Sequence, residues 1–174
     1  MNFLMKILLI DDEEAILDVF KQALQQANFE VITALTGAEG MDKTRQEHPD
    51  VIFLDQVLPD MNGNQVLQQL KADPDTKRIP IAILSNFNQD TLVQNAMKMG
   101  ASDYILKYQI APQDLIAKAN GLLQEVHLAP PSPQVVKDPG EPVATAAPGT
   151  IQSPASPIAA PSQVNPKVEE TKAS

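Results

Sequence analysis

Short apolar runs alternate five times with longer amphipathic stretches over residues 6–126, and this alternation limits the possible folds more than any other feature. The apolar runs are too short for helices and are mostly apolar on both faces, which is typical of strands inside a parallel sheet. We expect strands at 6–10, 30–34, 51–54, 81–84 and 103–106, and helices at 13–27, 37–47, 64–72, 89–99 and 112–126. Five such units predict an open α/β sheet covered by helices on both faces.

Polar or charged residues stand at the ends of four of these strands. They are Asp11 and Asp12, Asp55, Ser85, and Lys107. Because the carboxyl ends of parallel strands meet at one edge of the sheet, we expect these side chains to converge. Each has an ordinary alternative: acids and serines cap helices and turns, and lysines are mostly solvated. Asp55, however, ends the apolar run VIFL, where an unpaired ionised group would cost several kcal/mol.

Three carboxylates at one edge of the sheet would repel one another. At about 5 Å and an effective dielectric near 20, each like-charged pair costs on the order of 3 kcal/mol. Lys107 supplies only one positive charge, so we expect a divalent cation to supply the rest of the charge that offsets the three carboxylates. All-oxygen ligands favour Mg²⁺ over zinc, for which the sequence has no His or Cys cluster. A cation, an ammonium and a hydroxyl around one carboxylate suit an incoming phosphoryl group.

The same residues resemble those of the receiver domain of two-component response regulators. The likeness covers roughly residues 6–126 and rests on LLIDDEE, DQVLPDMNG, the serine of ILS, and ASDYILK. It implies a single receiver domain over residues 1–128 with a flavodoxin-like, doubly wound five-stranded parallel sheet in the order 2-1-3-4-5. It also implies a signalling switch, not an enzyme with a separate substrate, that takes a phosphoryl group from a sensor histidine kinase or phosphotransfer protein.

The resemblance implies a role for each acid at the strand ends. Asp55 would be the phosphoacceptor and also a ligand of Mg²⁺. Asp12 would ligate Mg²⁺ directly and Asp11 mainly through water. The backbone carbonyl of Val57 would complete the protein ligands.

It also implies how phosphorylation would be sensed. Ser85 and Lys107 would bind the phosphoryl oxygens, and Tyr104 would turn inward when Ser85 moves toward the phosphate. An aspartyl phosphate adds about −1.5 to −2 charge, which can bias a two-state loop. We expect the surface of the fourth helix, fifth strand and fifth helix to change its affinity for an unidentified downstream protein.

Two apolar residues bear on how long the phosphorylated state lasts. Val57 follows the acceptor by two positions and Phe87 follows Ser85 by two, and in this family both positions flank the path of the attacking water. Neither side chain can orient water, which predicts slow loss of phosphate. The alternative for Phe87 is that it packs into the core. Pro59 and Gly63 fit a restricted turn and a flexible start to the third helix.

The sequence departs from the family pattern at two positions. Tyr108 follows Lys107, where receiver domains usually have a proline in a cis bond, so we expect a longer and differently folded loop before the last helix. Asn86 follows Ser85, where alanine or glycine is usual. We expect Asn86 to donate a hydrogen bond to the phosphate rather than to block its access.

Composition separates the last 46 residues from the rest. Ten of the 15 prolines lie in residues 129–174, which predicts a disordered tail whose PxxP spacings are most simply those of a linker. Residues 1–128 carry ten basic and 18 acidic side chains, a net charge of −8 that disfavours direct binding of nucleic acid. The absence of a 20-residue apolar stretch argues against membrane insertion. The absence of cysteine suits a cytoplasmic location.

Three other functions share parts of this pattern. A flavin-binding module has the same architecture but places hydroxyls and amides, not acids, after its first strand. A haloacid-dehalogenase-like phosphatase uses an aspartate and Mg²⁺ but needs a DxD motif and a larger chain. The third is a receiver fold that binds partners without phosphorylation, which Asn86 and Tyr108 keep open.

Overall fold

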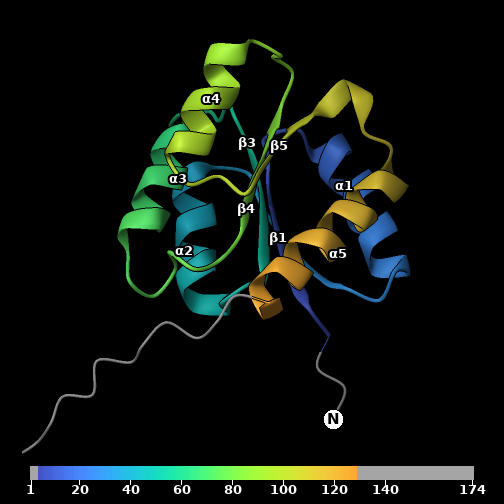
Figure 1. Ribbon diagram of the computed structural model, residues 1–174. Helices are drawn as coiled ribbons and strands as arrows, with labels where there is room; N and C mark the ends of the chain where they lie inside the picture. The colour runs from blue at the N-terminus through green and yellow to red at the C-terminus, as the bar shows by residue number, and fades with distance from the viewer. Residues whose placement is uncertain (1–3, 129–174) are drawn as a thin grey trace, which may run out of the picture. The chain divides into compact units, whose positions relative to one another are not determined.

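The computed structural model describes residues 4–128, which form a five-stranded parallel sheet with helices on both faces (Figure 1). The strands are β1 (Lys6–Ile10), β2 (Glu30–Ala34), β3 (Val51–Asp55), β4 (Ile81–Ser85) and β5 (Asp103–Leu106). Their order is β2-β1-β3-β4-β5, which confirms the predicted flavodoxin-like topology. The predicted disordered tail, 129–174, lies outside the described residues.

The helices are divided between the two faces of the sheet (Figure 1). The helices are α1 (Glu14–Gln26), α2 (Gly37–Glu47), α3 (Gly63–Ala72), α4 (Asp90–Lys98) and α5 (Pro112–Leu128), with a 3₁₀ turn η1 (Lys107–Gln109) after β5. Helices α1 and α5 pack on one face, and α2, α3 and α4 on the other. No helix among the described residues is long and apolar enough to cross a membrane.

Successive residues of the central strands supply two separate hydrophobic cores. Leu9 and Phe53 pack toward α1 and α5, whereas Leu8 and Leu54 pack toward α2 and α3. Side chains alternate between the faces of a strand, so a strand covered on both faces must be apolar at every position. Burial of each such side chain contributes roughly 1.5–3 kcal/mol. This explains why these strands show continuous apolar runs.

The register of the strands carries the polar residues to one edge. Ile10 pairs with Leu54 and Asp55 pairs with Leu84, so Asp11 and Asp55 follow the last apolar pair on β1 and β3. The backbone N–H of Asp11 donates to Ala34 O at 3.0 Å and continues the ladder by one residue. Because the side-chain period is two, Asp11 and Asp55 project on the same face as Leu9 and Phe53.

Some element boundaries differ from the predicted ones. Strands β3 and β4 each extend one residue further, to Asp55 and Ser85, because the parallel ladder continues through them. Helix α1 begins at Glu14, with Glu13 as its N-cap residue. Lys107 itself begins one 3₁₀ turn that ends at Gln109, and two residues separate this turn from Pro112, the first residue of α5.

Gly63 allows α3 to begin directly against the end of β3. Its N–H donates to Gln56 O at 2.9 Å, and a Cβ at this position would overlap the carbonyl oxygen of Asp55. Backbone atoms cannot move aside as the end of a flexible side chain can. The requirement at this position is therefore space, not the flexibility expected from the sequence.

Replacing Gly63 with alanine should destabilise the protein by about 2–3 kcal/mol, since the added methyl group overpacks a backbone contact. Gly121 lies inside α5, and a Cβ there would meet nothing within 4 Å. Gly121→Ala should instead stabilise by about 0.5–1 kcal/mol through helix propensity. Urea unfolding of both variants measures the difference, and equal stability of Gly63→Ala and the parent would contradict the steric argument.

Candidate functional site

Three carboxylates meet at the carboxyl edge of the sheet. Asp11 follows β1 and is 1% exposed, and Asp55 ends β3 and is 5% exposed. Asp12 lies beside them with an exposed side chain. Each of the three offers a carboxylate oxygen, and these oxygens lie within 4.8 Å of one another. The sheet therefore brings two buried acids and one exposed acid to a single point.

Lys107 reaches this point from the end of the edge strand β5. It is the first residue of η1, directly after the edge strand β5, and its side chain is buried. Its Nζ lies 2.7 Å from Asp11 Oδ2, 3.1 Å from Asp55 Oδ2 and 3.3 Å from Glu13 Oε1. One ammonium thus faces three carboxylates.

Burial dominates the electrostatics of the two inner acids. Loss of solvation raises the pKa of Asp55, and the ion pair with Lys107 offsets this only in part while Asp11 adds to it. Burial likewise raises the pKa of Asp11 despite its contact with Lys107. Burial alone would lower the pKa of Lys107, but Asp11 and Asp55 outweigh it and raise that pKa. Lys107 therefore stays protonated. Its single positive charge does not fully offset the negative charges of Asp11 and Asp55.

This arrangement fits a hard divalent cation. Oxygen ligands of Mg²⁺ sit at 2.0–2.1 Å from the ion, so ligand oxygens lie about 2.9 Å apart when adjacent and about 4.2 Å when opposite. The carboxylate oxygens of Asp11, Asp12 and Asp55 all lie within 4.8 Å of one another, close to those spacings. The donor set is entirely oxygen, as Mg²⁺ prefers.

Ser85 and Tyr104 meet at the loop that follows β4. The Ser85 side chain is fully buried, and its Oγ accepts a hydrogen bond from the N–H of Phe87 at 3.0 Å. The Tyr104 hydroxyl donates to Phe87 O at 2.9 Å. The backbone of Phe87 is therefore tied both to the serine at the site and to the tyrosine of β5.

A cavity of about 290 Å³ opens onto Asp55. It is lined by Asp12, Glu13, Asp55, Gln56, Val57, Asn86 and Phe87. The side chains of Val57 and Phe87 are 53% and 47% exposed. The alternative that Phe87 packs into the core is therefore wrong, since it lies at the mouth of this cavity.

The loop between β3 and α3 contains residues that sequence reasoning missed. Gln56 is buried, and its Nε2 donates to Asn62 Oδ1 at 2.8 Å, while Val57 and Asn62 form an isolated β-bridge. Asn62 also caps α3, in a capping box with Gln65. The N-x-x-Q spacing could have revealed this cap from the sequence, whereas the partner of Gln56 could not be read from it.

Asp60 ties the same loop to another helix. Its carboxylate accepts hydrogen bonds from the N–H groups of Gly37 at 2.8 Å and Ala38 at 2.9 Å, at the start of α2. A helix N-terminus favours a carboxylate in this position. Slight burial would raise the pKa of Asp60, but the backbone N–H donors outweigh it and lower that pKa. The loop that carries Val57 is thus held by the Gln56–Asn62 hydrogen bond and by the contact of Asp60 with α2.

The comparisons with known proteins agree with this geometry. Residues 7–120 match the family model of the response regulator receiver domain. The chain belongs to this family. It is 32% identical over 118 residues to the protein PilH of Pseudomonas aeruginosa, an alignment that covers 68% of this chain and 97% of PilH.

Other relatives are longer. The chain is 32% identical over 133 residues to the alkaline phosphatase synthesis transcriptional regulatory protein PhoP of Bacillus subtilis, covering 76% of this chain and 54% of PhoP. It spans about half the length of PhoP and of several other transcriptional regulators that it matches. The crystal structure of a CheY-like receiver domain protein from Methanospirillum hungatei superposes with a TM-score of 0.67 at 30% identity, covering 72% of this chain and 98% of that protein.

Replacing Asp60 with alanine should destabilise the domain by about 1 kcal/mol at pH 7, because two N–H groups of α2 lose their acceptor. The lowered pKa of Asp60 means that its contribution is complete above the ordinary value of 3.8 and is lost as pH falls through the folded-state value. Urea unfolding at pH 7, 5 and 3 should therefore show a difference that shrinks below 3.8. Asp42→Ala, which removes an exposed acid of α2, serves as the control. A difference independent of pH would contradict the assignment.

Proposed function

We propose that this protein is a phosphorylation-dependent signalling switch of a two-component phosphorelay, with Asp55 as the phosphoacceptor. The observation that carries the proposal is the buried Asp55 carboxylate, which lies 3.1 Å from Lys107 Nζ and opens onto a cavity of about 290 Å³. Such a carboxylate is sheltered from bulk water yet can be reached from outside. Lys107 offsets the negative charge of Asp55 only in part, so the site favours a cation, which a phosphoryl group also needs.

The donor in this proposal is a phosphohistidine of a sensor histidine kinase or a phosphotransfer protein. An oxygen of Asp55 forms a bond to phosphorus while the bond from phosphorus to the imidazole nitrogen breaks, and the electron pair of that bond stays with the nitrogen. Lys107 and the Ser85 hydroxyl then donate hydrogen bonds to the phosphoryl oxygens. The domain modifies itself and does not turn over a separate substrate.

Mg²⁺ belongs to the same proposal. Asp11, Asp12, Asp55 and the backbone carbonyl of Val57 would hold it, and it would supply positive charge to the oxygens of the transferring group. Val57 lines the same cavity as Asp12 and Asp55, on the loop that Asp60 bonds to the start of α2. The role of Asn86, which lines the same cavity, is to donate a hydrogen bond to the phosphate.

The output in this proposal is a change in binding to a downstream protein at the face formed by α4, β5 and α5. Tyr104 supports it, because one residue both holds the loop next to Ser85 and lines a cavity of about 300 Å³ beside η1 and α5. When Ser85 turns toward the phosphoryl group it must give up the N–H of Phe87. That loss changes the loop that Tyr104 contacts and so reaches the β5 surface.

Acetyl phosphate tests the acceptor directly. Incubation with acetyl phosphate and Mg²⁺, followed by intact mass measurement, should add one phosphoryl group to the parent and none to Asp55→Asn, because the amide cannot attack phosphorus. Removal of Mg²⁺ with a chelator should abolish the gain in the parent. No gain in the parent would instead favour a receiver fold that binds its partners without phosphorylation, a reading that Asn86 at the cavity mouth also permits.

The lifetime of the phosphorylated state provides a second test. A carboxylate at Phe87, 47% exposed at the cavity mouth, can orient the attacking water. Phe87→Glu should therefore speed loss of phosphate roughly tenfold, below the usual range for general acid–base catalysis because the water is only positioned. Met97→Glu, at an exposed position of α4, is the matched control. Equal lifetimes in Phe87→Glu and Met97→Glu would show that position 87 does not act on the water.

A further inference from the structure

Glu13 contacts both an acid and the lysine of the ion-pair network at the site, namely Asp11 and Lys107. It is the N-cap residue of α1, and its backbone N–H donates to Asp11 Oδ1 at 3.0 Å. Its carboxylate accepts a hydrogen bond from Lys107 Nζ at 3.3 Å. The side chain is 52% exposed and lines the cavity that leads to Asp55. Glu13 is therefore the solvent-facing acid in contact with a buried lysine.

The contact places Glu13 in competition with an incoming phosphoryl group. Lys107 is shared among Asp11, Asp55 and Glu13, and its Nζ is closer to the two buried acids than to Glu13. Asp11 and Asp55 are fixed by the ends of their strands, whereas Glu13 reaches the lysine from the N-cap position of α1 and lines the cavity. An anionic group that enters the cavity meets this carboxylate in the lining.

We propose that Glu13 is a positioning residue that holds Lys107 in the unphosphorylated state and opposes its transfer to the phosphoryl group. This inference rests on the proposed phosphorylation of Asp55. Two effects act in the same direction: the hydrogen bond from Lys107 must be given up or shared, and the negative charge of Glu13 repels the anionic donor. Glu13 thus lowers the rate at which Asp55 is phosphorylated.

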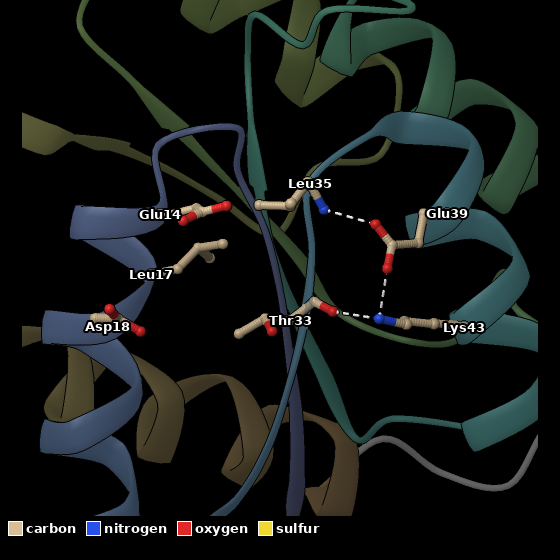
Figure 2. Close-up of a pocket in the computed structure, with 7 residues that line it drawn as sticks. All are labelled: Glu14, Leu17, Asp18, Thr33, Leu35, Glu39 and Lys43. Carbon is tan, nitrogen blue, oxygen red and sulfur yellow. Dashed lines mark hydrogen bonds and ion pairs between the residues drawn. The ribbon is translucent and has the colours of Figure 1, made fainter.

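The neighbouring residue Glu14 offers a matched control. It is the first residue of α1, directly after Glu13, and it carries the same charge and is exposed. It lines a different cavity, of about 260 Å³, between α1, β2 and α2, where Figure 2 shows it with Leu35, Glu39 and Lys43. Lys43 in that cavity is bound to Glu39 and to Thr33 O. Glu14→Gln therefore changes the net charge as Glu13→Gln does, at a site that Lys107 does not border.

The contact itself can be tested without Mg²⁺ or phosphate. The side-chain ammonium resonance of Lys107, assigned with Lys107→Arg, should shift in Glu13→Gln and stay in place in Glu14→Gln. This measurement reports on the hydrogen bond to Glu13 in the unphosphorylated protein. An unshifted resonance in Glu13→Gln would contradict the proposal that Glu13 restrains Lys107 through this hydrogen bond.

The effect on phosphorylation is measured by the rate of mass gain with acetyl phosphate and saturating Mg²⁺. Glu13→Gln should react about three to ten times faster than the parent and Glu14→Gln less than twofold faster, since a half-exposed charge is partly screened by water. The advantage of Glu13→Gln should shrink as salt is raised from about 0.02 M toward 1 M, where the Debye length falls to about 3 Å. A structural role would not produce this salt dependence.

The two proposals fail in different ways. Equal rates in Glu13→Gln and Glu14→Gln, with a phosphoryl group still gained by both, would overturn the inference about Glu13 alone. The absence of any gain in the parent and both variants would overturn the proposed function, and the inference about the phosphorylation rate with it. Thermal melting of both variants confirms that each is folded before the rates are compared.

Discussion

The ion pair of Lys107 with Asp11 and Asp55 is the interaction on which the site depends. It joins the end of β1, the end of β3 and the turn after β5, which are far apart in the sequence. One ammonium cannot neutralise two buried carboxylates, and burial raises the pKa values of both. The site is therefore built with a deficit of positive charge. Uncompensated negative charge at an open cavity favours the binding of a cation, and a cation is also what an incoming phosphoryl group needs.

The loop after β3 shows how backbone packing supports this charge arrangement. Gly63 lets α3 start against the carbonyl of Asp55, and Asp60 fastens the loop to the N-terminus of α2. A hydrogen bond between the side chains of Gln56 and Asn62 joins the two ends of the loop. These contacts hold Val57 at the edge of the acidic cluster. In the proposed function the backbone carbonyl of Val57 is a Mg²⁺ ligand, and a backbone already held in place would need no rearrangement to bind the ion.

The loop after β4 connects Ser85 to Tyr104 of the neighbouring strand β5. Ser85 and Tyr104 both bond to the backbone of Phe87, one through its N–H and the other through its carbonyl. A change at the serine therefore acts on the same residue that the tyrosine holds. The contact surface of β5 and α5 is within reach of that change because Tyr104 lies on it. In the proposed function these two hydrogen bonds link a change of charge at Asp55 to the surface of β5.

The sequence by itself determined the order of strands and helices and the residues at the strand ends. Continuous apolar runs arise because these strands are covered on both faces, so Asp55 and Lys107 stood out at their ends. Only the tertiary structure decided which polar groups meet: Glu13 with Lys107, Gln56 with Asn62, and Asp60 with the start of α2. It also decided that Phe87 is exposed and that position 63 needs space. Periodicity records which face of an element is buried, whereas these contacts depend on the distance and angle between elements that the sequence pattern does not encode.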